Sequence, residues 1–153
     1  MDQSEPPVRL QPPPRAVVRV VNPVVRRLLT SSLGSRLPAT MHLLEFTGRR
    51  SGRRFSVPVG VHEVAGGPVA FTEAAWRFNF AGGREVLVRR GPSVRRGTGE
   101  LVADAEAVAD ALEQALAAVG PQGLGLRTAP GHVVTRDDLV RLGRGLVRLR
   151  LDG

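Results

Sequence analysis

Four arginines within six positions are the residues of this sequence with the clearest capacity for chemistry. Residues 47–58 read Thr-Gly-Arg-Arg-Ser-Gly-Arg-Arg-Phe-Ser-Val-Pro. Gly48 and Gly52 permit the positive φ of a sharp turn, which would leave backbone N–H groups pointing outward. These groups, the forked guanidinium donors and the Ser51 hydroxyl together favour an anion such as phosphate. A solvated, arginine-rich turn is the alternative interpretation.

The whole chain shows the same bias toward anionic partners. Its 153 residues include 22 basic residues, all arginine, against 14 acidic ones, a formal net charge of +8. Guanidinium groups suit phosphate and carboxylate, so nucleic acid, a membrane surface and a phosphorylated small molecule are all candidate partners. Aromatic residues are only 4% of the chain. Because this leaves few side chains for base stacking, we expect no nucleic acid.

Other catalytic machinery is absent from the sequence. It has no cysteine and no tyrosine, which excludes thiolate nucleophiles, disulfides and phenolic acids. The three histidines, His42, His62 and His132, lack metal-ligand spacing, so we expect structural roles for them and no metal site. No phosphate-binding loop or nucleophile elbow occurs. Any difficult chemistry would therefore require a bound cofactor.

Strand periodicity dominates the region that must position the arginines. An apolar stretch over 42–47 and a period-two alternation over 55–62 flank the glycine-bearing loop, and predict a β-hairpin. Pro58 cannot donate to a ladder, so one side of its strand should be an edge or face a ligand. Further strands are predicted over residues 69–73, 85–90, 93–102 and 146–151.

Two helices and a helical turn complete the predicted core. Asp104–Val119 has the clearest helical pattern, with Asp104 as its N-cap. Thr135, followed three residues later by Asp138, caps a short helix, and Ala74–Gly82 reads as a helical turn. Six strands with one long helix before the last predict a mainly β (α+β) fold, a small barrel and not a doubly wound parallel sheet.

The N-terminal part is predicted to be different. Residues 1–14 contain five prolines and are interpreted as a flexible arm, with residues 15–153 as a single domain. Apolar spacing over 15–33 predicts a basic amphipathic helix that begins or kinks at Pro23. This helix packs on the core or lies on an anionic membrane. With no spanning stretch, signal peptide or cysteine, we expect a cytoplasmic protein, with membrane association through this helix as an open alternative.

The arginine stretch resembles the signature of the deazaflavin (coenzyme F-420)-dependent nitroreductases and oxidoreductases. That family has Gly-Arg-Lys/Arg-Ser/Thr-Gly followed six positions later by proline, which is matched by Gly48, Arg49, Arg50, Ser51, Gly52 and Pro58. Trp76-Arg77-Phe78-Asn79-Phe80 is similar to the family's Trp-x-x-Asn-Leu segment. The resemblance covers roughly residues 22–151. It implies a split β-barrel, related to flavin-binding barrels.

The same resemblance implies a set of cofactor-binding residues. The anionic tail would be held by Arg50, Ser51, Arg53 and Arg54, and Arg49 belongs to the same cofactor-binding set. One side of the deazaflavin would be lined by Phe55, Ser56, Val57, Pro58, Val59 and Gly60, and the other by Thr72, Trp76 and Asn79. The sequence departs from the family at Glu73, which would repel a phosphate near a family lysine, and in lacking the tyrosines that some members place over the substrate.

The function implied is an oxidoreductase that passes a hydride from reduced F-420 to an electron-poor small molecule, such as a quinone, an enone or a nitro compound. No catalytic side chain is named, because the deazaflavin itself carries the hydride. Two other classes stay open: a non-catalytic barrel that binds F-420, FMN or haem, and a basic module for nucleic acid or membrane surfaces. Related barrels occur as monomers and as homodimers, and either is expected here.

Overall fold

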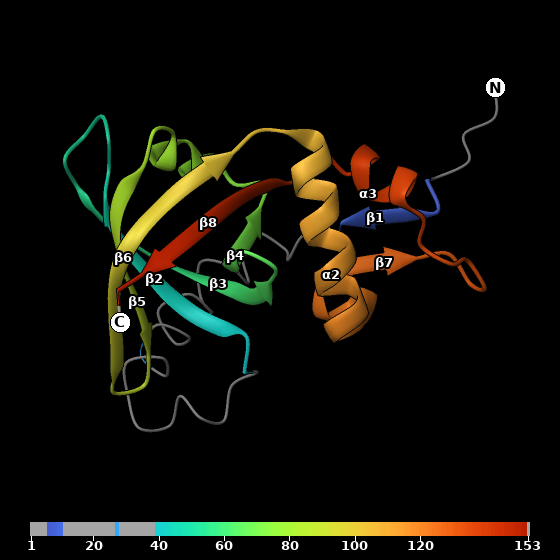
Figure 1. Ribbon diagram of the computed structural model, residues 1–153, viewed down its shortest axis with the longest axis horizontal. Coiled ribbons are helices and arrows are strands. Elements are labelled where there is room, and N and C mark those ends of the chain that lie inside the picture. Colours follow the sequence, from blue (N-terminus) through green and yellow to red (C-terminus); the bar gives the residue numbers. More distant parts are fainter. Residues whose placement is uncertain (1–5, 11–26, 28–38, 153) are drawn as a thin grey trace.

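Six antiparallel strands close into a barrel in the order β2-β3-β4-β8-β6-β5 (Figure 1). The computed structural model describes residues 6–10, 27 and 39–152. The barrel strands are β2 (Met41–Thr47), β3 (Arg54–Val64), β4 (Gly67–Thr72), β5 (Arg84–Arg90), β6 (Ser93–Val102) and β8 (Gly145–Leu151). The predicted six-stranded antiparallel barrel, with its long helix before the last strand, is confirmed.

Strand alternation decides which side chains fill the barrel, because successive residues point to opposite faces. The inward-facing residues form one buried cluster, which comprises Leu44, Phe46, Val61, Phe80, Val86, Val88, Val147 and Leu149. Phe80 belongs to the 3₁₀ helix η2 (Ala75–Phe80), which follows β4. The interior is thus packed with side chains, and a ligand must bind at an end or on the outside.

A second layer covers one outer side of the barrel. It consists of α2 (Ala105–Gly123), α3 (Arg136–Arg141) and the two-stranded sheet of β1 (Val8–Leu10) and β7 (Leu126–Thr128). Figure 1 shows α2 between the barrel and this small sheet. Its apolar face, with Val108 and Leu112, packs against Phe71 of β4 and Leu126 of β7 in a separate buried cluster.

The helix ends follow the predicted capping residues. The Asp104 carboxylate accepts a hydrogen bond from the Ala107 N–H at 3.2 Å and begins α2. Regular helical geometry stops at Gly120, whose φ is +73°, immediately before Pro121. Thr135 and Asp138 form a reciprocal capping box at the start of α3. None of the described helices has the length and hydropathy needed to cross a membrane.

The N-terminal region differs from its prediction. The flexible arm expected over residues 1–14 is wrong for Val8–Leu10, which pair antiparallel with Leu126–Thr128. Val8 is 5% exposed and joins the cluster around α2. A strand of three residues is too short to show a period in the sequence, so tertiary packing alone reveals this strand. The rest of the predicted arm and the predicted helix over 15–33 lie outside the described residues, apart from Arg27.

Candidate functional site

The β2–β3 hairpin ends in the loop Gly48–Arg53, which carries the arginine motif. The Gly48 N–H donates to the Arg53 carbonyl at 2.7 Å, and the Gly52 N–H donates to the Gly48 carbonyl at 3.0 Å. Gly52 has a φ of +67°, which favours glycine. A Cβ on Gly48 would lie 2.5 Å from the Phe55 ring. Both glycines are therefore required, one for the turn and one for the close approach of Phe55.

The loop's backbone donors are largely used inside the protein. Besides the two glycine N–H groups, the Arg49 N–H donates to Asn79 Oδ1 at 2.7 Å and the Arg53 N–H to Ser51 Oγ at 3.2 Å. The prediction that the loop's N–H groups point outward to an anion is wrong for these four. Their partners lie in the loop itself and in η2. These four N–H groups are therefore not available to an anion.

Asn79 ties the loop to η2. Its side chain accepts from the Arg49 N–H and donates from Nδ2 to the Trp76 carbonyl at 2.8 Å. The loop and η2 consequently lie together at the upper end of the barrel in Figure 1. Asn79 is a positioning residue, because both halves of its amide are occupied by backbone groups.

A hollow of about 800 Å³ lies between the loop and η2. It is lined by Gly48, Arg49, Arg50, Ser51 and Phe55 from the hairpin, and by Ala75, Phe78 and Asn79 from η2. Two of these are large aromatic residues that remain in contact with solvent: Phe55 is 37% exposed and Phe78 54% exposed. The hollow thus offers cationic donors beside apolar ring surfaces, the combination that a flat heterocycle with an anionic tail requires.

Both exposed rings are held by neighbours. Phe55 stacks on the buried Phe46 ring, with centroids 5.5 Å apart and planes 12° from parallel. The Arg77 guanidinium lies 4.3 Å from the centre of the Phe78 ring. Each ring therefore has one side fixed by the protein before any ligand arrives.

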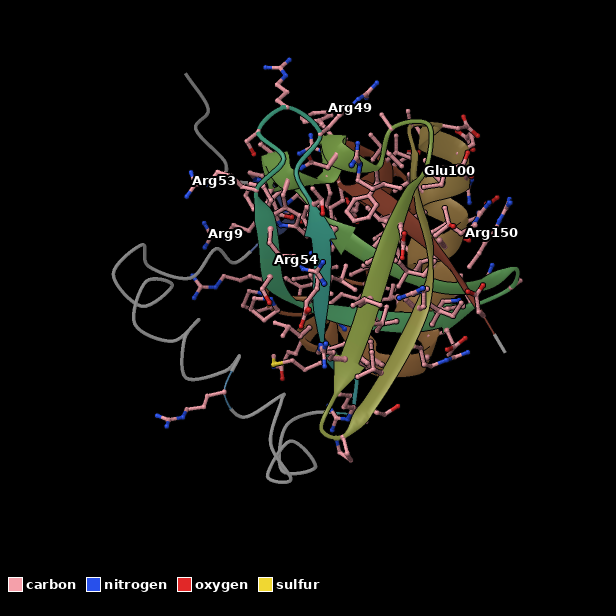
Figure 2. The ribbon with its side chains drawn as sticks, turned by 90° about the vertical axis from the view of Figure 1, so that its left-hand side faces the viewer. Arg9, Arg49, Arg53, Arg54, Glu100 and Arg150 are labelled. Atoms are coloured by element: carbon pink, nitrogen blue, oxygen red, sulfur yellow. The ribbon has the colours of Figure 1, made fainter. Side chains whose placement is uncertain are left out.

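The arginines of the motif separate into two groups. Arg49 and Arg50 line the hollow, whereas Arg53 and Arg54 do not. In Figure 2 the labelled Arg53 side chain extends away from the barrel strands. Arg54 lies 3.4 Å from the Glu45 carboxylate, so its charge is partly balanced by its neighbour in β2. Only the first group faces the space where a ligand would sit.

The other predicted ring-binding residues lie elsewhere. Val57, Val59 and Trp76 pack against the barrel interior, and the buried Thr72 accepts a hydrogen bond from the Ala74 N–H at 3.1 Å. Of the fourteen predicted residues, the structure gathers five in the hollow. The nine that it leaves out are Arg53, Arg54, Ser56, Val57, Pro58, Val59, Gly60, Thr72 and Trp76.

Pro58 lies where the sequence predicted an edge. It stands opposite Leu43 of β2, but the pairing of β3 with β4 begins only at Val61. No described strand therefore pairs with the other side of β3 at this proline. The missing donor breaks no hydrogen bond with β4.

Gly48, Ala75 and Phe78 line the hollow but are not among the predicted cofactor-binding residues, and the largest of them is Phe78. It occupies one of the variable positions of the Trp-x-x-Asn segment, so the motif drew no attention to it. Glu73, in contrast, was expected to repel a phosphate. Its carboxylate lies 3.5 Å from Arg144 Nε and does not line the hollow, so the acidic side chain does not oppose an anion there.

Two solved structures are remotely similar to this chain. No family model and no curated protein matches the sequence. One similar solved structure is a protein proposed to confer 5-nitroimidazole antibiotic resistance, from Bacteroides thetaiotaomicron VPI-5482, with 10% identity over 100% of this chain and 92% of that one and a TM-score of 0.45. Another is Atu2129, of unknown function, from Agrobacterium tumefaciens str. C58, with 17% identity over 97% and 60% and a TM-score of 0.39. Likenesses this remote carry nothing about function, which must be argued from the chain's own residues.

Proposed function

We propose that this chain is an oxidoreductase that binds the deazaflavin coenzyme F-420 in the hollow between the β2–β3 loop and η2, and reduces an electron-poor small molecule. The observation that carries the proposal is the pairing of Arg49 and Arg50 with the exposed rings of Phe55 and Phe78 around one space. The motif over Gly48–Pro58, which resembles the F-420-dependent family, supports the same assignment.

The residues present fit the parts of such a cofactor. Arg49 and Arg50 would bind the anionic tail through charge-assisted hydrogen bonds, and the ring would rest on Phe55 or Phe78. The bound deazaflavin supplies hydride transfer, while this chain binds and orients it. FMN has a comparable ring and phosphate and would meet the same donors. Haem fits poorly, because the described lining residues include no histidine, methionine, cysteine or tyrosine to ligate iron.

A non-catalytic carrier of the same cofactor is the second candidate. The observation that favours it is the exposure of Phe55 and Phe78. Hydride transfer profits from the exclusion of water, and among the described residues no element covers these rings. A carrier would bind the cofactor without passing on its hydride.

Titration of the purified protein with F-420, followed by the coenzyme's fluorescence, tests the binding site. We expect Arg50→Ala to weaken binding about tenfold or more, because a charge-assisted hydrogen bond contributes roughly 1.5–3 kcal/mol. Arg53→Ala is the matched control, since it removes the same charge from the same loop outside the hollow, and should change the affinity less than about threefold. Equal losses in both variants, or a Kd weaker than about 1 mM for the unmodified chain, would contradict the proposed site.

A second measurement separates the enzyme from the carrier. Reduced F-420 is mixed with the protein and, in turn, a quinone, an enone and a nitroaromatic compound, and recovery of the oxidised coenzyme's absorbance is followed. Protein-dependent recovery that falls in Arg50→Ala supports the oxidoreductase. Tight binding without recovery for any acceptor favours the carrier. Tighter binding of FMN than of F-420 in a parallel titration would overturn the choice of cofactor.

A further inference from the structure

The end of the barrel away from the β2–β3 loop holds a second cavity, of about 530 Å³. The β5–β6 turn lies at this lower end in Figures 1 and 2, and the β2–β3 loop lies at the upper end. The cavity and the hollow have no described lining residue in common. The cavity is therefore a separate site, and nothing in the proposed function uses it.

Inward-facing strand positions change from apolar to basic at this mouth. Along β5 the interior residues Val86 and Val88 are followed by Arg90. Arg95 of β6 stands opposite Val88 in the register, and His42 precedes the interior residue Leu44 by two positions in β2. All three basic side chains line the cavity. Its apolar lining includes Val61, Val88 and Leu151.

Two of the three basic groups, Arg90 and His42, are held in place by backbone carbonyls at the start of β2. The Arg90 guanidinium donates to the Met41 carbonyl at 2.6 Å. His42 Nδ1 lies 2.8 Å from the Thr40 carbonyl; a carbonyl only accepts, so Nδ1 carries the proton and Nε2 is the acceptor. Arg95 is exposed and makes no ion pair or hydrogen bond with any residue that the structure describes. Its guanidinium charge is thus unbalanced by the described chain.

The described residues at the mouth carry more positive than negative side chains, which favours a ligand with one negative charge. Glu63 is the one acidic residue among the described lining, against Arg90 and Arg95. Burial lowers the pKa of His42, and the charges of Arg90 and Arg95 lower it further, although the Thr40 carbonyl and Glu63 act in the opposite direction. Both cavity histidines are therefore neutral at pH 7, since burial and the Arg144 charge also lower the pKa of His62. Among the described lining residues, the guanidinium groups of Arg90 and Arg95 therefore outnumber the single carboxylate of Glu63.

We propose that this mouth binds a small monocarboxylate with an apolar body. The carboxylate lies against Arg95 and Arg90, and the hydrocarbon or aryl part contacts Val61, Val88 and Leu151. Glu63 disfavours a dianion such as a phosphate monoester, and the valine and leucine surface disfavours a fully hydrated anion. The space available accommodates a ligand of small-drug size.

Titration of the full chain with 4-phenylbutyrate, followed by the methyl NMR signals of valine and leucine, tests this site. The matched probe 4-phenylbutanamide has the same apolar body without the charge. We expect the signals of Val61, Val88 and Leu151 to shift saturably with the carboxylate, and its affinity to exceed that of the amide by about tenfold. No saturable shift below about 10 mM, or equal affinities for the acid and the amide, would overturn the proposal.

Substitutions of two neighbouring arginines test which side chain of the protein binds the carboxylate. Arg95→Gln should weaken binding of 4-phenylbutyrate about fivefold to tenfold. Arg96→Gln removes the same charge one residue away, where Arg96 lies outside the cavity and pairs with Glu85 at 3.3 Å, and should leave the affinity unchanged. Arg50→Ala should also have no effect, which separates this site from the cofactor hollow. Equal losses in the Arg95 and Arg96 variants would show that only the general charge matters and would overturn the proposal.

Discussion

Asn79 joins the two walls of the hollow through a single side chain. We expect Asn79→Ala to speed hydrogen exchange at the Arg49 amide, because that N–H loses its acceptor at 2.7 Å, and to lower the free energy of unfolding by about 1 kcal/mol. Affinity for F-420 should fall about threefold to tenfold, since the loop loses its fixed position.

Asn79→Asp is the control for this prediction. It keeps the oxygen that accepts from the Arg49 N–H, while the donor to the Trp76 carbonyl is replaced by a charged carboxylate oxygen. Protection of the Arg49 amide should therefore persist. Unchanged exchange at Arg49 in Asn79→Ala would show that the loop is held by other contacts.

Asp138 makes the stability of the fold depend on pH in the acid range. Its carboxylate accepts from His132 Nε2 at 2.7 Å and from the Thr135 N–H at 2.9 Å, and these bonds, that of His132 foremost, lower the pKa of Asp138 from 3.8 to about 2. Because the folded-state pKa is the lower one, this stabilisation is complete above the unfolded value and is lost as the pH falls from about 4 to 2.

Melting temperatures measured between about pH 4 and 2 test whether stability falls as the pH falls. The unmodified protein should lose stability progressively between about pH 4 and 2. Asp138→Asn should melt lower at pH 7 and show a flatter profile over the acid range, whereas Asp137→Asn, the exposed neighbour in the same helical turn, should keep the original profile. Parallel profiles for the unmodified chain and Asp138→Asn would contradict this role.

At the scale of elements, the hollow depends on the packing of η2, whose Phe80 side chain lies among the buried residues of the barrel. Gly99 of β6 faces Phe80, and a Cβ there would lie 2.5 Å from the ring. We expect Gly99→Ala to destabilise the fold by about 1–3 kcal/mol, because the packed interior cannot accept the extra methyl group. Denaturant unfolding measures the change.

Two further variants test whether crowding between Gly99 and Phe80 is the cause of the destabilisation. Thr98→Ala, an exposed site on the same strand, should change stability by less than about 0.5 kcal/mol. If crowding is the cause, Gly99→Ala combined with Phe80→Leu should be less destabilised than the sum of the two single variants. Additive losses would mean that Phe80 and Gly99 do not oppose one another.

Local sequence patterns predicted most elements because each carries its own signal. The alternation over Phe55–His62 marks a strand with two different faces, and Asp104 and Thr135 mark the starts of helices. The pairing of Val8–Leu10 with Leu126–Thr128 has no such signal. Both strands are three residues long and are stabilised by packing against α2, a contact that periodicity does not encode.

At the scale of the whole molecule, the barrel carries a candidate site at each of two ends. The arginine-rich loop with η2 forms one, and the cavity beside the β5–β6 turn forms the other. The formal charge of +8 therefore favours anionic ligands in general, whereas the fold determines which arginines line a space where such a ligand can bind. Arg50 lines the hollow and Arg95 lines the cavity, whereas Arg53 and Arg96 line neither of these two spaces.

The candidate site was predictable only in part, because some of its contacts join residues that are far apart in the sequence. The motif located the loop, but the bond from the Arg49 N–H to Asn79 spans thirty residues of sequence. Such a bond leaves no local pattern, so the sequence suggested a nest of free N–H groups where the fold uses them internally. Phe78 likewise becomes a lining residue only because η2 packs beside the loop.

The most direct measurement of the central claim is an amide NMR titration of the full chain with F-420. Binding in the hollow predicts saturable shifts for the amides of Gly48, Arg50, Ser51, Phe78 and Asn79, lost in Arg50→Ala and retained in Arg53→Ala. The amides of the opposite mouth, such as those of His42 and Arg95, should not move. Shifts confined to that mouth, or spread evenly over the arginine-bearing surface, would contradict the assignment of the hollow as the cofactor site.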